Sequence, residues 1–179
     1  MYEVEVKVPA SHDTVRDRLA AIEADPAGSV VQEDTYYDAP HRDFPETDEA
    51  LRIRRETDAD GETEAQLTYK GPLIDTDSKT REEAETAVND GGELETILES
   101  LGFDPVARVR KERDRYDAGE FTVTLDTVEG LGEFVEVETQ TTEQNVDAAR
   151  EEAFSLLERL DLDPADQIRT SYLELLLSE

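Results

Sequence analysis

The sequence predicts an α+β fold in which about eight antiparallel strands close into a β-barrel and helices pack on its outside. Short segments that alternate apolar and charged residues follow one another along the chain, most of them joined by turn residues. Three helical segments each carry one apolar stripe, which needs an apolar surface to cover. Strands are expected at residues 2–8, 30–38, 50–57, 64–70, 79–88, 106–116, 120–128 and 133–139, and helices at 11–23, 93–101 and 146–160.

The first strand, residues 2–8, sets the pattern with the sequence Tyr-Glu-Val-Glu-Val-Lys-Val. Because successive side chains of a strand point to opposite faces, Glu3, Glu5 and Lys7 share one face and the three valines share the other. Two interpretations follow. Either this is an edge strand whose charged face is exposed to solvent, or the charged face points into the interior of a closed sheet. In the second case the carboxylates would bind a metal and the lysine would bind an anion.

The boundaries in the first half of the chain come from capping and turn residues. Ser11 is expected to cap the first helix, and residues 26–29 to form a turn before the second strand. Residues 41–48 are polar and predict a loop. The next two strands form a hairpin around residues 58–61, and Gly71-Pro72 is expected to end the second of them.

The second half continues the alternation. The strand at 79–88 places Arg81, Glu83 and Glu85 on one face, and glycine turns join the last three strands. The helix at 146–160 is the clearest, with apolar residues at helical spacing. The tail contains leucines at 175–177, which either cover a barrel mouth or form a homodimer contact. No linker divides the chain, so residues 1–179 are expected to form a single domain.

The charged strand faces are expected inside the barrel. If the helices cover its apolar outside, the charges must line its interior, which is costly unless they are paired or hold ligands. The chain has only four lysines, and Lys7, Lys70 and Lys111 lie on these faces beside arginines and many carboxylates. A cavity with a cationic wall and a carboxylate cluster suits a polyphosphate bound with a divalent metal.

The composition limits which partners the protein is expected to bind and the environment in which it is expected to fold. The net charge of -29 disfavours nucleic acid and anionic membrane as partners. Few lysines on an acidic chain indicate adaptation to high salt, and therefore marginal folding at low ionic strength. No cysteine is present, which excludes disulfides and thiolate metal sites. Neither a secretory signal nor a membrane-spanning run is visible, so a cytoplasmic protein is expected.

Glu3-Val4-Glu5-Val6-Lys7 resembles the ExExK signature of the CYTH superfamily, the triphosphate tunnel metalloenzymes. The likeness continues along nearly the whole chain, through Leu51–Arg54, Leu67–Pro72, Arg81–Glu85, Lys111–Arg113, Leu125–Asp126, Gly130–Glu138 and Arg169–Tyr172. The glycine-rich turn and the tail are most similar to the class IV adenylyl cyclase, or CyaB-type, branch.

This resemblance implies an eight-stranded tunnel that binds a triphosphate with Mg²⁺ or Mn²⁺. Carried over by position, the implied metal ligands are Glu3, Glu5, Glu136 and Glu138. The implied triphosphate-binding residues are Lys7, Arg52, Arg54, Lys70, Lys111 and Arg113. The implied catalytic residues are Lys111, Arg113 and Asp126, of which Asp126 is a further metal ligand or the acceptor of the nucleophile's proton. Arg81, Glu83 and Glu85 either buttress the lumen or are purely structural.

The resemblance favours a cyclase that converts ATP to cyclic AMP and pyrophosphate. The rival activity is hydrolysis of thiamine triphosphate or inorganic tripolyphosphate, which needs the same phosphate clamp and metal. A third alternative is a binding module for nucleotide or polyphosphate without catalysis, against which the complete carboxylate set argues. No residue in the sequence selects adenine.

Overall fold

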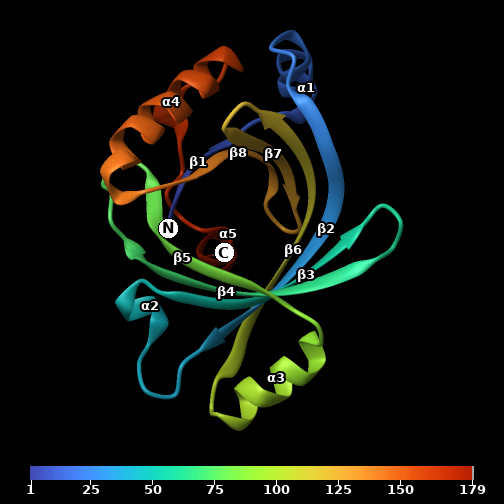
Figure 1. Cartoon of the computed structure of the whole chain (residues 1–179), viewed down its shortest axis with the longest axis vertical. Helices are drawn as coiled ribbons and strands as arrows, with labels where there is room; N and C mark the ends of the chain where they lie inside the picture. The colour runs from blue at the N-terminus through green and yellow to red at the C-terminus, as the bar shows by residue number, and fades with distance from the viewer. Residues whose placement is uncertain (179) are drawn as a thin grey trace.

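In the computed structural model, which describes residues 1–178, eight antiparallel strands close into a barrel with helices packed outside it (Figure 1). Around the barrel the strands follow the order β1-β5-β4-β3-β2-β6-β7-β8. They span Tyr2–Pro9 (β1), Asp25–Asp38 (β2), Ala50–Asp58 (β3), Thr63–Leu73 (β4), Lys79–Val88 (β5), Asp104–Ala118 (β6), Phe121–Val128 (β7) and Gly132–Thr141 (β8). The predicted fold class is confirmed.

The helices lie between or after the strands. They span His12–Ala21 (α1), Phe44–Thr47 (α2), Gly91–Ser100 (α3), Val146–Arg159 (α4) and Tyr172–Leu177 (α5), with short 3-10 turns at Glu143–Asn145 and Pro164–Asp166. The predicted loop at 41–48 therefore contains one helical turn, because the Asp43 side chain caps α2 by accepting a hydrogen bond from the Glu46 amide. No helix within residues 1–178 is long and apolar enough to cross a membrane.

Two predicted strand boundaries were wrong, both at prolines. The expected turn at 26–29 is part of β2, whose pairing with β6 shifts register between Pro26 and Ser29. Gly28 adopts φ 101° there, so an irregularity in the ladder accommodates the proline without ending the strand. β4 likewise continues past Gly71-Pro72 to Leu73, with a register shift in its pairing with β5.

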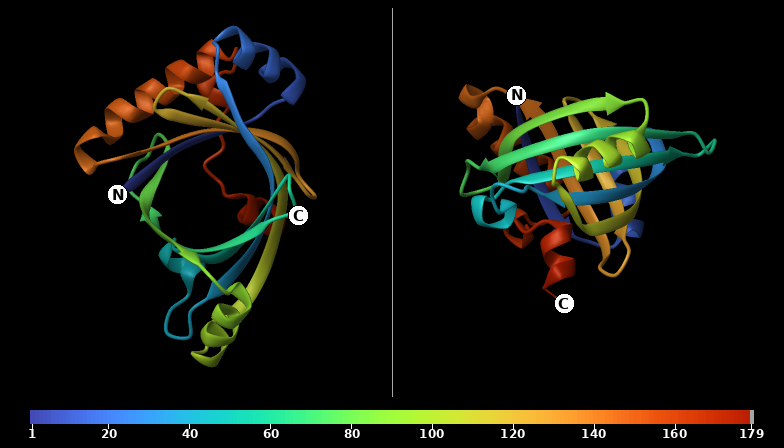
Figure 2. Two further views of the ribbon diagram at one scale, coloured as in Figure 1. Left: turned by 45° about the vertical axis from the view of Figure 1, so that its right-hand side comes forward. Right: turned by 90° about the horizontal axis from the view of Figure 1, so that it is seen from below.

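The apolar core lies outside the barrel, between the sheet and its helices. Val6 and Val137, on β1 and β8, are fully buried beneath α1 and α4, together with Leu19 and Leu157 of those helices. Figure 2 shows α1 and α4 lying over the outer side of this part of the barrel. Each such side chain contributes about 1.5–3 kcal/mol of burial free energy, so the apolar strand faces point outward and the charged faces inward.

The C-terminal segment returns to the barrel and lies at one of its ends (Figures 1 and 2). Before α5, Arg169 donates hydrogen bonds to the carbonyl oxygens of Asp75 and Ser78, which fixes the tail to the loop before β5. Ser171 and Glu174 then form a capping box that begins α5. α5 lines part of the interior cavity, but of the leucines at 175–177 only Leu177 belongs to that lining, while Leu175 and Leu176 pack against a small core with Tyr172. The expectation that these leucines cover a barrel mouth is therefore supported for Leu177 alone. The homodimer contact stays a prediction.

Candidate active site

A cavity of about 480 Å³ occupies the barrel interior and is lined mainly by the charged strand faces. The residues predicted for metal and triphosphate binding all lie on its wall: Glu3, Glu5, Lys7, Arg52, Arg54, Lys70, Lys111, Arg113, Glu136 and Glu138. All four lysines of the chain and half of its 18 basic residues line this one space. Alternation along the strands thus brought the predicted side chains together, although their roles in binding stay predictions.

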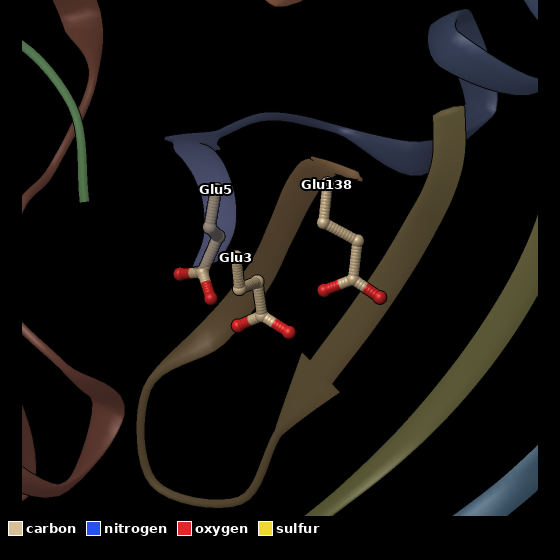
Figure 3. Close-up of side chains that lie close together, drawn as sticks. All are labelled: Glu3, Glu5 and Glu138. Atoms are coloured by element: carbon tan, nitrogen blue, oxygen red, sulfur yellow. The ribbon is translucent and has the colours of Figure 1, made fainter. Parts of the chain in front are cut away.

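Three of the predicted metal ligands form a compact group. Glu3 and Glu5 project from β1 and Glu138 from β8, and each offers a carboxylate oxygen within 4.8 Å of the others (Figure 3). Glu5 and Glu138 are directly opposite each other in the β1–β8 register. Like charges placed opposite each other destabilise a sheet, so this three-carboxylate cluster is a site where a cation is favoured.

The three carboxylates of the cluster differ in whether a lysine lies close enough to balance their charge. Glu3 lies 3.1 Å from Lys70 Nζ, and Glu5 lies 3.1 Å from Lys79 Nζ. Burial opposes the ionisation of Glu3, but the Lys70 ammonium and further groups outweigh it and lower the pKa of Glu3 to about 2. Burial and the nearby Glu3 carboxylate raise the pKa of Glu138 to about 8. Within residues 1–178 the Glu138 side chain has neither a hydrogen-bond nor an ion-pair partner.

This donor set fits a small divalent cation. Mg²⁺ and Mn²⁺ prefer hard oxygen ligands, which the three carboxylates together would supply. The fourth predicted ligand, Glu136, is placed differently. Its carboxylate accepts a hydrogen bond of 2.7 Å from Arg113 and lies 3.6 Å from Lys7 Nζ, outside the three-carboxylate cluster.

Two arginines of the cavity wall are held by buried aspartates. Arg54 donates two hydrogen bonds of 2.7 Å to Asp34, and Arg113 donates two of 2.6 Å to Asp126. In both cases the partners are opposite each other in neighbouring strands, β2–β3 and β6–β7. Such paired bonds fix the plane and direction of a guanidinium group, so these two arginines are oriented before any ligand arrives.

Asp126 is the one predicted site residue that does not line the cavity. It is fully buried behind Arg113, and one of its oxygens also accepts a hydrogen bond from the Tyr172 hydroxyl at 2.9 Å. Strand alternation gives the face on which a residue lies but not its depth behind a neighbour. This geometry favours a positioning role for Asp126, and its implied roles as a further metal ligand or proton acceptor stay predictions.

Lys111 differs from the other lysines because it has no carboxylate within 4.0 Å among the described residues. It is 5% exposed and faces the cavity. Burial, reinforced by the Arg113 and Arg54 guanidinium groups, lowers the pKa of Lys111 to about 7. A buried cation with cationic neighbours is stabilised by an anion, so a phosphate group close to Lys111 would stabilise its charged form.

Arg81, Glu83 and Glu85 all line the cavity and each has a protein partner. Arg81 donates a hydrogen bond of 2.9 Å to the Gly71 carbonyl, which connects β5 to the irregular end of β4. Glu83 lies 3.0 Å from Lys70 Nζ, and Glu85 accepts a hydrogen bond from Thr68. These contacts support the lumen wall, in line with the buttressing alternative.

Sequence reasoning missed three contributors to the site. Lys79 lies on the same strand face as Arg81, so alternation could have found it. Asp34 lies two residues before Tyr36 on β2 and therefore on the same strand face, which the period of a strand could have shown. Tyr172 belongs to the Arg169–Tyr172 segment of the family resemblance, but alternation could not place it at the cavity, because its position depends on the return of the tail across the barrel.

Fold and site together define a class of protein: antiparallel barrels with a cationic wall and a carboxylate cluster in the interior. The chain belongs to the CYTH family, whose domain matches residues 1–172. CYTH proteins are typically enzymes with adenylyl cyclase or triphosphatase activity; they bind triphosphates such as ATP and use divalent metals.

Three relatives document this membership. The chain is 41% identical over 177 residues to the "Putative adenylate cyclase MJ0240" of Methanocaldococcus jannaschii, covering 98% of both proteins. It is 31% identical over 175 residues to the adenylate cyclase CyaB of Aeromonas hydrophila, covering 96% of this chain and 86% of that protein. The solved structure of PH1819 from Pyrococcus horikoshii superimposes with a TM-score of 0.91 at 41% identity, covering 98% of each chain.

Proposed function

We propose that this protein is an adenylyl cyclase-like enzyme that uses Mg²⁺ or Mn²⁺ to convert ATP to cyclic AMP and pyrophosphate. The observation that carries the proposal is the shared cavity, in which a three-carboxylate cluster faces arginines held in place and the unpaired Lys111. The names of the relatives from Methanocaldococcus and Aeromonas support cyclisation over other triphosphate chemistry.

The side chains of the cavity have separate tasks in this proposal. Glu3, Glu5 and Glu138, with Glu136 as the fourth implied ligand, would hold the metal, which neutralises phosphate charge when bound. The phosphate oxygens would be bound by Lys7, Arg52, Arg54, Lys70, Lys111 and Arg113. Asp126 holds the Arg113 guanidinium in position. The ribose 3′-oxygen would then bond to the α-phosphorus as its hydroxyl proton passes to solvent water, the bond from the α-phosphorus to the α–β bridging oxygen would break, and pyrophosphate would leave with that oxygen.

One end of the cavity supports a substrate that carries an organic group. Tyr36 at the end of β2, Phe44 and Pro45 of α2, and Leu173 of α5 contribute apolar surface to the lining. Tyr36 and Leu173 also pack against the same small core beside the barrel mouth. Bare tripolyphosphate would leave this surface unused, whereas a nucleoside would cover it. The surface itself does not distinguish adenine from another ring system.

The proposal is tested by product analysis in high salt. The protein is incubated separately with ATP, thiamine triphosphate and tripolyphosphate, each with Mg²⁺ or Mn²⁺, and Glu138→Gln serves as the matched control. Cyclic AMP and pyrophosphate from ATP support the proposal. Orthophosphate from any of the three makes the protein a triphosphatase, and tight binding without turnover under all conditions makes it a binding module.

A further inference from the structure

We propose that Tyr172 of α5 is a positioning residue that holds the ammonium groups of Lys7 and Lys111 at the cavity wall. Docking of the C-terminal helix thereby completes the phosphate site. The inference rests on the proposed binding of a triphosphate, but it does not depend on which reaction follows.

The Tyr172 ring lies beneath both lysines. Lys7 Nζ is 3.9 Å and Lys111 Nζ 5.0 Å from the centre of the ring, and Tyr172 is 5% exposed. Both distances are within the range of cation–π attraction. An aromatic face attracts an ammonium group without neutralising its charge. The two lysines are thus held in place while their charge stays available for phosphate.

The ring is itself fixed from three sides. Its hydroxyl donates a hydrogen bond of 2.9 Å to Asp126, and the Phe134 ring packs edge-on at 5.1 Å. The capping box at Ser171 and Glu174 fixes the backbone at the start of α5. Because Asp126 also holds Arg113, one aromatic residue is connected to three cations of the wall.

A purely structural role for Tyr172 predicts something different. Tyr172 packs with Val109, Val128 and Phe134 in a small core that also includes Leu176 of the same helix. If the ring only anchored α5, any apolar residue of similar size would replace it, and weakening the helix elsewhere would have the same effect. Replacement by a non-aromatic residue removes the ring face from both lysines, whereas weakening the helix elsewhere leaves the ring face in place, so the two changes separate the two roles.

The test compares variants of the full-length protein in high salt with Mg²⁺. The variants are Tyr172→Phe, Tyr172→Met and the control Leu176→Ala, which removes packing from α5 at a residue that does not line the cavity. Affinity for inorganic tripolyphosphate is measured by calorimetry, KM and kcat with ATP by product formation, and stability by thermal unfolding.

Tyr172→Met is expected to weaken tripolyphosphate binding about tenfold and to raise KM more than it lowers kcat. Tyr172→Phe keeps the ring and is expected to retain most of the affinity of the unmodified protein. Leu176→Ala is expected to leave the affinity unchanged although it lowers the stability. Equal affinities for Tyr172→Met and the unmodified protein would overturn the proposal. So would a loss of affinity in Leu176→Ala as large as that in Tyr172→Met.

If Tyr172→Met does not fold, a series of fluorinated phenylalanines at position 172 still tests whether the ring face holds the two ammonium groups. Each fluorine weakens the negative potential of the ring face with little change of shape, so affinity should fall stepwise from phenylalanine to the pentafluoro form. A flat series would refute the proposal. Because the readout is tripolyphosphate binding, absence of cyclic AMP would refute the proposed reaction alone, whereas absence of any tripolyphosphate binding would refute both.

Discussion

The cationic wall and the three-carboxylate cluster lie in the same cavity but are stabilised in opposite ways. Arg54 and Arg113 are held by buried aspartates behind them, with hydrogen bonds of 2.6–2.7 Å. Glu138 has no such partner within residues 1–178 and faces Glu5 across the ladder. The two arginines are therefore fixed by the protein itself, whereas Glu138, unlike Glu3 and Glu5 with their lysine partners, gains most from a cation supplied from outside.

The largest expected effect is on the cluster. Glu138→Gln should lower kcat about 100-fold or more, because a metal contributes several kcal/mol of charge stabilisation. Metal affinity should fall with it, measured by Mn²⁺ binding and by the metal concentration that gives half-maximal activity. Glu136→Gln tests whether Glu136 belongs to the metal site or to the phosphate-binding wall. An equal loss of Mn²⁺ affinity would make Glu136 a ligand, and retained affinity with poor triphosphate binding would assign it to Arg113 and Lys7.

The next effect is on the residues that hold the wall. Asp34→Asn should lower the free energy of unfolding by about 3 kcal/mol, because it leaves the Arg54 charge buried without its counterion. Burial opposes ionisation of Asp34, but Arg54 and Arg52 outweigh it and hold the pKa of Asp34 below its usual range. This stabilisation is present at neutral pH and is lost as the pH falls through the folded-state pKa. Urea unfolding in high salt measures it; unchanged stability would mean that the wall does not depend on Asp34.

A smaller effect concerns Lys111, whose pKa of about 7 places its charge change near neutral pH. Phosphate binds the charged form, so affinity for tripolyphosphate should fall by up to tenfold per unit as the pH rises above about 7. The groups that influence this titration are Arg113, Arg54, Asp126 and Glu136. The same shift in pKa lowers stability. The unfolded chain binds the Lys111 proton more tightly than the folded chain does, so the free energy of unfolding is reduced at pH values below about 10.

Two variants of Lys111 check this prediction by calorimetry between pH 7 and 9.5. Lys111→Arg should bind with little pH dependence, because a guanidinium group stays charged throughout this range. Lys111→Ala should bind more weakly at every pH. A pH dependence that persists unchanged in Lys111→Arg would assign the titration to another group.

The smallest effect is expected from the exterior, where charges are exposed to solvent. Arg110 lies 3.8–3.9 Å from three exposed glutamates, and Arg110→Ala should change stability by less than about 1 kcal/mol. The acidic surface as a whole acts differently, since the net charge of -29 opposes compaction when salt is removed. Circular dichroism across a salt titration should show unfolding at low ionic strength, and a fold that persists in millimolar salt would contradict this.

The sequence predicted the barrel because alternation and turn residues are local properties. The same alternation assigned Glu5 and Lys7 to the interior, where both are buried. It could not show that Asp126 lies behind Arg113, since depth is set by how two side chains on neighbouring strands meet. The role of Tyr172 was equally hidden, because its contacts with β6, β7 and β8 join segments that are distant in the sequence.

The confinement of every lysine to the cavity has a practical consequence. Amine-reactive reagents would find almost no ε-amino group on the outer surface, since the lysine side chains range from 1% to 13% exposed. Labelling, apart from the N-terminal amine, would therefore occur within the tunnel, and a bound triphosphate should shield these amines. Mass spectrometry of modified peptides would then give a direct footprint of occupancy, with the exposed N-terminal amine as an internal reference.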